Sequence, residues 1–242
     1  MSRRTIAVMS GKGGVGKTSI SLLVAKVLSQ YGKTILLDFD ICGPSITTAL
    51  NPSGSLIKTS IGFKPLNASE NLDVLSFGSI LQESDAVIWR GPKKLVFLDM
   101  FYKSSEDYDF AVIDTPPGIS EEHDFLVDKN IEVLIVTTPQ NIALNDTQRG
   151  IEFCQNKNIK VLGLIENMSF VKCDCCNQIY HPFGTNGGVQ LANEYKISCL
   201  GSLEIESELS ESIDSGMFNN EFKIFKAYNS IKDILINLKI IQ

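Results

Sequence analysis

The sequence lacks long apolar runs, a recognisable targeting segment and an excess of positive charge. None of its apolar runs approaches the ~18–20 residues that a membrane-crossing helix needs. Its first ten residues, MSRRTIAVMS, are short and polar, so we expect neither a signal peptide nor a mitochondrial presequence. Lys and Arg number 22 against 28 Asp and Glu, and the net charge of −6 argues against nucleic-acid binding driven by overall charge. We therefore expect a cytoplasmic protein with neither membrane nor nucleic acid as partner.

Cysteine and histidine are also scarce, with six and two residues in a chain of 242. Cysteines of a cytoplasmic protein stay reduced, so we do not expect a structural disulfide. Half of the cysteines nevertheless fall within four positions, as Cys173, Cys175 and Cys176. They lie in a loop predicted over 169–184, which makes this loop the candidate site for a metal or a cluster.

Apolar, strand-like runs alternate with amphipathic helical patterns along the whole chain. The runs are too continuously apolar for half-exposed strands and are typical of parallel strands buried on both faces. Such alternation predicts right-handed βαβ units and a doubly wound, mostly parallel α/β sheet. We find no repeat, linker or break in composition and expect a single domain over 1–242. The predicted strands cover 5–10, 34–40, 72–77, 110–115, 132–138, 160–168 and 198–203.

A phosphate-binding loop follows the first predicted strand. The segment GKGGVGKT (11–18) matches G-x-x-x-x-G-K-[S/T] and precedes a helix predicted over 18–31. Its glycines let backbone N–H groups surround phosphate oxygens, and the helix N-terminus adds positive potential. Lys17 would neutralise the β- and γ-phosphates of ATP, and Thr18 would bind Mg²⁺. The predicted nucleotide-binding residues of the loop are Gly11, Lys12, Gly13, Gly14, Val15, Gly16, Lys17 and Thr18.

Three aspartates lie at the C-terminal ends of two predicted strands. In doubly wound sheets this edge borders the ligand-binding crevice. Asp114 is predicted to be the Walker-B-like carboxylate near Mg²⁺, and Asp38 to support the shell of the same ion. Asp40, just past its strand, is our candidate for orienting or activating the attacking water. With Lys12 and Lys17 it forms the predicted catalytic set of an ATPase.

Six motifs occur in one order along the chain: GKGGVGKT, DFDICGPS, WRGPKK, YDFAVIDTPPG, TTPQ and ENMSF. Together they resemble the Mrp/ApbC-type iron–sulfur carrier ATPases, a branch of the MinD/ParA-like P-loop class that has a signature lysine. The loop alone identifies the class. The branch is identified by DICGPS, WRGP, and ENMS followed by a cysteine pair. The resemblance extends from the first strand to about residue 220.

This resemblance implies a homodimer, or a heterodimer with a related scaffold ATPase, that binds ATP between its subunits. It also implies a labile [4Fe–4S] cluster that bridges the subunits and is transferred to apo iron–sulfur proteins, with cluster-assembly factors as further partners. Lys12 would reach the partner's nucleotide, and Asn167 would contact the adenine base. The longer eukaryotic cytosolic members carry an N-terminal four-cysteine extension, which is absent here. The chain thus resembles the short cytosolic scaffold subunit or a compact prokaryotic carrier, with slow ATP hydrolysis.

The cysteine spacing bears on how many chains form the site. A [4Fe–4S] cluster takes four thiolates. One loop with Cys173 and Cys176 supplies two, so two subunits are needed, in agreement with the role implied for Lys12. Relatives show a clean C-x-x-C, whereas this chain has CDCC, so Cys175 is a third candidate ligand. We expect the other cysteines to serve packing, with redox sensitivity as the alternative for the first of them: Cys42, Cys154 and Cys199.

Zinc is the main alternative at this loop. Cys173, Cys176 and His181 begin like a zinc knuckle, but Asn186 stands where the fourth ligand should follow. Two C-x-x-C pairs across a dimer could also bind Zn²⁺, and an unmetallated loop is a third interpretation. The second histidine, His123, is expected to cap a helix and to have no chemical role.

Two other functions stay open. A MinD/ParA-type positioning ATPase would need a basic DNA-binding face or a membrane helix richer in basic residues than the C-terminal segment 227–242. That segment has an apolar stripe at helical spacing, and packing on the sheet is the commoner explanation. An ATP-coupled electron-transfer reductase resembling the nitrogenase iron protein would take its cluster ligands from widely separated positions, unlike the adjacent cysteines here.

Overall fold

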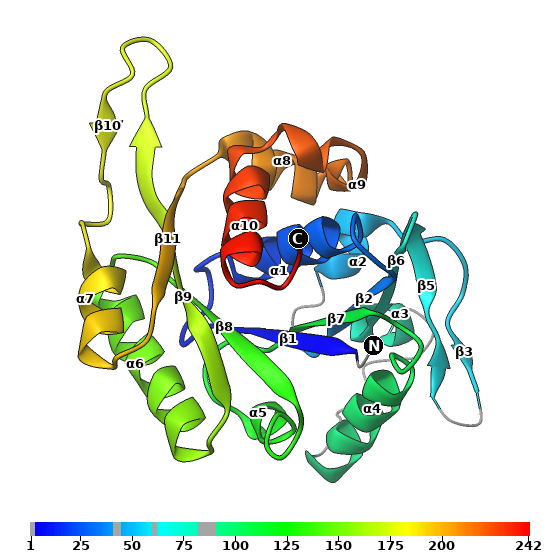
Figure 1. The fold of residues 1–242 in the computed structure, drawn as a ribbon. Helices are drawn as coiled ribbons and strands as arrows, with labels where there is room; N and C mark the ends of the chain where they lie inside the picture. The colour runs from blue at the N-terminus through cyan, green and yellow to red at the C-terminus, as the bar shows by residue number, and fades with distance from the viewer. Residues whose placement is uncertain (1–2, 41–44, 60–61, 82–90) are drawn as a thin grey trace.

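The computed structural model describes residues 3–40, 45–59, 62–81 and 91–242, and for 80, 81 and 91–93 the backbone alone. Its central sheet has the strand order β10-β9-β8-β1-β7-β2-β6-β5, with β11 beside β9 (Figure 1). The strands are β1 Arg4–Met9, β2 Thr34–Asp38, β3 Ile57–Lys58, β4 Phe63–Lys64, β5 Leu66–Ser69, β6 Leu72–Ser76, β7 Phe110–Asp114, β8 Ile131–Thr137, β9 Lys160–Lys172, β10 Ile179–Tyr180 and β11 Cys199–Glu204.

Helices cover both faces of this sheet. They are α1 Lys17–Leu28, α2 Ile46–Leu50, α3 Phe77–Leu81, α4 Gly91–Lys103, α5 Glu121–Asp124, α6 Asn141–Asn156, α7 Gly187–Glu194, α8 Ser207–Asp214, α9 Phe218–Glu221, the 3₁₀ turn η1 Phe222–Ile224 and α10 Lys226–Asn237. No helix within the described ranges is both apolar and long enough to cross a bilayer.

The predicted doubly wound, mostly parallel sheet is confirmed. Strand β1 lies between β7 and β8 and pairs in parallel with both, and β2 continues the parallel set between β7 and β6. Antiparallel pairing occurs at the two ends of the sheet, where β5 joins β6 and β10 joins β9. Neither β5 nor β10 was predicted, because both are short and lack the continuous apolar run of a buried strand.

Two predicted boundaries are wrong in ways that matter for the site. Strand β2 ends at Asp38 rather than at residue 40. Strand β9 runs to Lys172 rather than to residue 168, since its last residues pair with β10, with Tyr180 opposite Val171. The predicted cysteine loop is therefore a β-hairpin, and this hairpin extends beyond the body of the domain (Figure 1).

Each face of the sheet has its own apolar core. One core is formed by α1, α2, α9 and α10, and the other by α4, α6 and the segment around α5. The C-terminal stripe belongs to the first, where α10 lies against α1 and buries Ile231, Ile234 and Leu235. Packing, the commoner explanation for the stripe, is thus confirmed for these three side chains.

One lysine lies inside the first core. Lys26 of α1 is 1% exposed. Its ammonium donates to Ser69 Oγ at 2.7 Å and lies 4.9 Å from the centre of the Phe222 ring. Burial lowers the pKa of Lys26 from 10.5 to about 8. At pH 7 the ammonium is therefore charged at a cost to folding, and this cost disappears as the pH rises from about 8 towards 10.5.

Replacing Lys26 with methionine is expected to raise the free energy of unfolding by about 2 kcal/mol at pH 7. The buried charge costs about 3 kcal/mol, whereas the lost cation–π contact was worth about 1 kcal/mol. The gain should shrink as the pH approaches 10, where the wild-type amine is neutral in the folded state. Urea unfolding at both pH values measures it. Lys223→Met is the matched control, since exposed Lys223 lies 5.6 Å from the same ring and should show no such pH dependence.

Candidate functional site

The phosphate loop joins β1 to α1 at the C-terminal edge of the sheet. Gly14 and Gly16 have φ of 81° and 83°, a left-handed conformation that side chains rarely adopt. The first glycine of the loop is required for a different reason. A Cβ on Gly11 would lie 2.2 Å from the backbone carbon of Asp146 in α6, so the loop packs directly on that helix.

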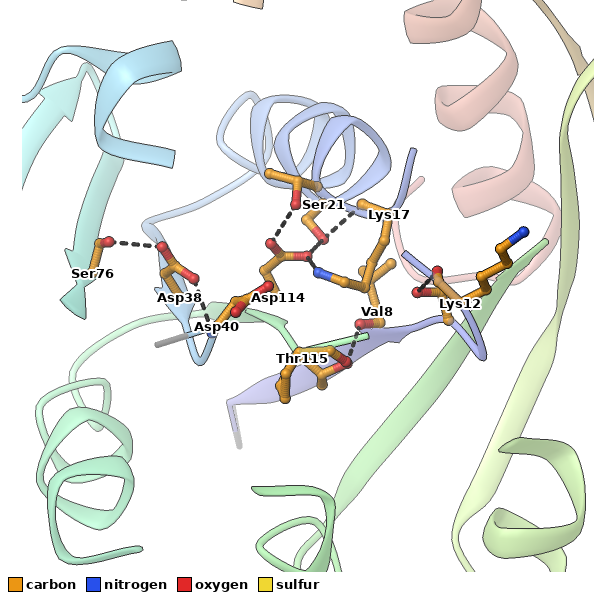
Figure 2. Close-up of polar contacts among 12 residues, drawn as sticks. Val8, Lys12, Lys17, Ser21, Asp38, Asp40, Ser76, Asp114 and Thr115 are labelled. Atoms are coloured by element: carbon orange, nitrogen blue, oxygen red, sulfur yellow. Dashed lines mark hydrogen bonds and ion pairs between the residues drawn. The ribbon is translucent and has the colours of Figure 1, made fainter. Parts of the chain in front are cut away.

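Lys17, at the start of α1, is held by a buried carboxylate. Its ammonium donates to Asp114 Oδ1 at 2.7 Å, with the two side chains 6% and 2% exposed. Thr18 Oγ1 donates to Asp114 Oδ2 at 2.8 Å, and Ser21 Oγ donates to Oδ1 at 2.7 Å (Figure 2). The structure thus brings together three residues predicted to serve the phosphates and Mg²⁺, namely Lys17, Thr18 and Asp114.

Asp38 lies on the strand beside Asp114, in register with it. Ser76 Oγ donates to Asp38 Oδ2 at 2.7 Å, and the backbone N–H of Asp40 donates to Oδ1 at 3.0 Å. Burial, and next the charge of Asp114, raise the pKa of Asp38 to about 8. Two carboxylates therefore lie side by side, and burial together with the charge of Asp114 opposes the ionisation of Asp38 at neutral pH.

The two lysines of the loop point in different directions. Figure 2 shows the Lys12 side chain extending away from the cluster of Lys17 and Asp114. Lys12 is half-buried and makes no ion pair with any residue that the structure describes. Its backbone carbonyl accepts a hydrogen bond from Ser10 Oγ at 3.0 Å, which fixes this part of the loop. This geometry leaves its ammonium available to a group outside its own phosphate loop.

The segment after β7 is fixed to β1. Thr115 donates to Val8 O through both its backbone N–H and its hydroxyl, and Gly118 N donates to Ser10 O at 2.9 Å. The expected helix cap is confirmed, since His123 Nδ1 accepts from Ser120 N at 3.1 Å. Burial lowers the pKa of His123 to about 4. The imidazole is therefore neutral and carries its proton on Nε2, which has no hydrogen-bond partner among the described residues.

Asn167 lies against the phosphate loop. Its Nδ2 donates to Val15 O at 2.9 Å, and the residue is 8% exposed. The structure thus places Asn167 at the nucleotide site, whereas its contact with adenine stays a prediction. Asp40 is half-buried beside Asp38, and its action on water likewise stays a prediction.

The three clustered cysteines occupy the turn of the β9–β10 hairpin. Cys173 N donates to Gln178 O at 2.9 Å and Asn177 N donates to Cys173 O at 2.8 Å, which closes the turn. Cys173 is half-exposed, and Cys175 and Cys176 are exposed. Hydrogen bonds from the backbone N–H groups of Cys176 and Cys175 lower the pKa of the Cys173 thiol. The turn presents thiols, one of them predisposed to ionise, to the outside of the molecule.

The described residues of one chain do not gather further metal-binding side chains around the cysteine turn. Within the ranges that the structure describes, no three His, Cys, Asp or Glu side chains are placed to hold one ion. His181, the third residue of the possible zinc knuckle, instead bonds through Nδ1 to Ser169 O at 2.9 Å. Ile179 and Tyr180 beside the turn are 53% and 51% exposed.

The remaining cysteines behave differently. Cys154 is fully buried, and burial raises the pKa of its thiol to about 12, as expected for a packing residue. Cys199 is half-buried and packs beside the second core. Cys42, with its predicted packing role, and the tryptophan–arginine pair of WRGPKK lie outside the described residues.

The sequence analysis did not predict two serine hydroxyls that donate hydrogen bonds to the aspartates, Ser21 to Asp114 and Ser76 to Asp38. Ser21 lies one turn after Lys17 on α1, so helical spacing alone could have placed it beside the same carboxylate. Ser76 ends β6 in register with Asp38. Finding it requires knowing that β6 lies beside β2, which no motif in the sequence indicates.

Comparison with known proteins identifies the family to which this site belongs. A model described as ParA, NUBPL iron-transfer P-loop NTPase, matches residues 2–238. The chain belongs to this family. Its P-loop NTPase class agrees with the phosphate loop and the strand-end aspartates described above.

Individual relatives agree with this assignment. The chain is 43% identical over 216 residues to a "Cytosolic Fe-S cluster assembly factor Nubp2 homolog" of Drosophila pseudoobscura pseudoobscura, covering 84% of each chain. It is 37% identical to the rat "Cytosolic Fe-S cluster assembly factor NUBP2", covering 96% of this chain and 90% of that protein. These names agree with the expected class of function and cytosolic location.

Solved structures agree on the fold. A nucleotide-binding protein of Archaeoglobus fulgidus in complex with ADP superimposes with a TM-score of 0.73 at 28% identity, covering 90% of this chain and 88% of that one. The MinD protein of Pyrococcus horikoshii with Mg-ADP has a TM-score of 0.66 at 17% identity, covering 98% and 96% of the two chains. The second likeness bears on the fold alone.

Proposed function

We propose that this chain is an ATP-dependent scaffold that holds a labile [4Fe–4S] cluster as cargo and transfers it to apo iron–sulfur proteins in the cytosol. The observation that carries the proposal is the hairpin turn that presents half-exposed Cys173 and exposed Cys175 and Cys176. Buried cysteines that serve packing are inert, whereas exposed thiols near backbone N–H donors suit a metal. The names of the relatives support iron–sulfur assembly as the process.

The cluster around Asp114 supports ATP hydrolysis as the proposed reaction. Lys17 would exchange its contact with Asp114 for the β- and γ-phosphates, and Lys12 would neutralise charge on the partner's nucleotide. Thr18, Asp38 and Asp114 offer oxygen donors of the kind that Mg²⁺ prefers. They suit a cation because Asp38 and Asp114 lie in register on neighbouring strands, and a bound cation would offset the repulsion between their carboxylates. Magnesium would supply charge for the leaving phosphate, while Asp40 orients the water.

The proposed cluster site needs two chains, either two copies or this chain with a related scaffold ATPase. Cys173 and Cys176 of each hairpin would supply four thiolates, the number that a [4Fe–4S] cluster takes. The hairpin extends beyond the domain body, so a second chain can approach it without rearranging either core (Figure 1). Lys12, which points away from its own phosphate loop, is consistent with the same arrangement.

Anaerobic reconstitution with iron and sulfide tests the proposal. The wild-type protein should take up about four iron and four sulfide per dimer and acquire visible absorption. Cys173→Ala and Cys176→Ala should each lose this load while nucleotide binding survives. Cys175→Ala is the matched control from the same turn and should retain the cluster.

A full iron and sulfide load in both Cys173→Ala and Cys176→Ala would refute the proposal. Uptake of zinc without visible absorption would instead assign the pair to a Zn²⁺ site. If Cys176→Ala alone keeps a partial load, the double replacement of Cys175 and Cys176 should remove it, which would identify Cys175 as the substitute ligand.

A further inference from the structure

Strand β9 contains a bulge between the phosphate loop and the cysteine hairpin. Ser202 of β11 pairs with Glu166, and Glu204 pairs with Phe170. Between these two pairs the chain advances by two residues on β11 but by four on β9. Residues 167 to 169 of β9 therefore form a bulge. Met168 has φ of 54°, the left-handed conformation that residues other than glycine and asparagine rarely adopt. Bulges redirect side chains and are frequent beside active sites.

The first two residues of the bulge lie directly against the phosphate loop. A Cβ on Gly16 would lie 2.2 Å from Asn167 Nδ2 and 3.5 Å from the terminal methyl of Met168. Asn167 Nδ2 also donates to Val15 O, as described above. Because no space separates the loop from the bulge, a displacement of Gly16 or Val15 must displace Asn167 as well.

The last residue of the bulge is bound to the cysteine hairpin. Ser169 O accepts from His181 Nδ1 at 2.9 Å, and since a carbonyl only accepts, Nδ1 carries the proton. His181 follows β10 directly, on the strand that returns from the cysteine turn. The His181 ring also lies edge-on to Phe170, with the ring centres 6.3 Å apart. A movement of Ser169 is thereby passed to both strands of the hairpin.

A buried carboxylate gives the bulge a fixed support. Glu166 is 2% exposed and accepts from Ser169 Oγ at 2.8 Å and from Gly188 N, the start of α7, at 2.5 Å. Its partners are hydroxyl and amide groups, and it forms no ion pair with a described cation. This network ties Ser169, at the hairpin end of the bulge, to Glu166 just before the bulge, so the two ends of the bulge are bound to each other.

From these contacts we infer that the bulge of residues 167–169 couples the phosphate loop to the cysteine hairpin, with Asn167 as the positioning residue at the loop and His181 at the hairpin. The inference rests on the proposed function, since it concerns how nucleotide alters the exposure of the cluster-binding thiols. Nucleotide that displaces Val15 or Gly16 changes the hydrogen bond of Asn167, and the bulge moves the cysteine turn.

The rate at which N-ethylmaleimide labels Cys173 tests this coupling in full-length, reduced, cluster-free protein. Peptide mass spectrometry separates Cys173 from the other cysteines. Saturating magnesium with a non-hydrolysable ATP analogue should change the wild-type rate by about fivefold or more, the range of ordinary coupling between sites. Asn167→Ala and His181→Ala should each reduce this change to less than about twofold.

His181→Ala carries the decisive result, because exposed His181 does not touch the phosphate loop and its loss should leave folding and nucleotide affinity intact. If Asn167→Ala fails to fold or to bind nucleotide, His181→Ala alone decides. Asn193→Ala, an exposed asparagine on α7, is the matched control and should keep the full response.

A full nucleotide response in His181→Ala would overturn the inference, and so would a wild-type rate that nucleotide does not alter. Because the labelling needs no cluster, its outcome is independent of reconstitution. A nucleotide response without cluster uptake would support the coupling and refute the proposed function. Cluster uptake without a nucleotide response would support the proposed function and refute the coupling.

Discussion

Replacing Lys17 with methionine is expected to lower the ATP hydrolysis rate at least about 10²-fold and to destabilise the nucleotide-free protein by about 3 kcal/mol. The first effect follows from losing the cation that neutralises the β- and γ-phosphates. The second follows from the buried pair with Asp114, since methionine would leave an uncompensated carboxylate next to Asp38. Phosphate release and urea unfolding at pH 7 measure the two effects.

Lys12→Met is the matched control for this substitution. Lys12 is half-buried and has no ion-pair partner among the described residues, so its loss should change the free energy of unfolding by less than about 0.5 kcal/mol. It should still slow hydrolysis if Lys12 acts on the partner's nucleotide. Equal stability of Lys17→Met and the wild-type protein would mean that the contact with Asp114 contributes nothing to the fold.

The second large effect is expected at Gly11. A methyl group there would lie 2.2, 2.3 and 2.4 Å from backbone atoms of Asp146 and Thr147 in α6. Backbone atoms in a packed helix cannot move aside, so Gly11→Ala must separate the phosphate loop from α6. We expect a loss of more than about 4 kcal/mol in the free energy of unfolding and no measurable nucleotide affinity. Chemical denaturation and binding of a fluorescent ATP analogue measure both.

Gly13→Ala shows whether the effect depends on position. The nearest atom to a Cβ on Gly13 is Pro117 Cβ, at 3.9 Å, an ordinary contact. Gly13 also lies outside the set of residues with positive φ. This variant should therefore fold with wild-type stability. Comparable losses in the two variants would show that the loop tolerates no alanine for reasons other than its packing on α6.

The sequence was sufficient to predict the parts of the site that local rules determine. The phosphate loop, the strand before it and the helix after it follow from glycine spacing and apolar periodicity. Asp38 and Asp114 were predictable because carboxylates at the ends of parallel strands meet at one edge of the sheet. The structure confirms that Thr18 and Lys17 lie beside Asp114.

The rest depends on contacts between distant segments. The steric requirement at Gly11 comes from α6, more than a hundred residues away, and a pattern of glycines does not reveal it. The bulge around Met168 arises from how β9 pairs with β11, and it ends the apolar run that predicted a strand only to residue 168. The cysteine segment appeared as a loop because β10 has two residues, too few to produce a periodic signal.

The exposed hairpin has a consequence for the isolated chain. Cys175 and Cys176 are exposed together with the apolar side chains of Ile179 and Tyr180. A lone chain therefore presents oxidisable thiols beside exposed apolar side chains, a combination that favours oxidation of the thiols by air to intermolecular disulfides, and aggregation. Pairing through the hairpins would cover both at once. In that arrangement association protects the most vulnerable part of the molecule at the same time as it completes a binding site.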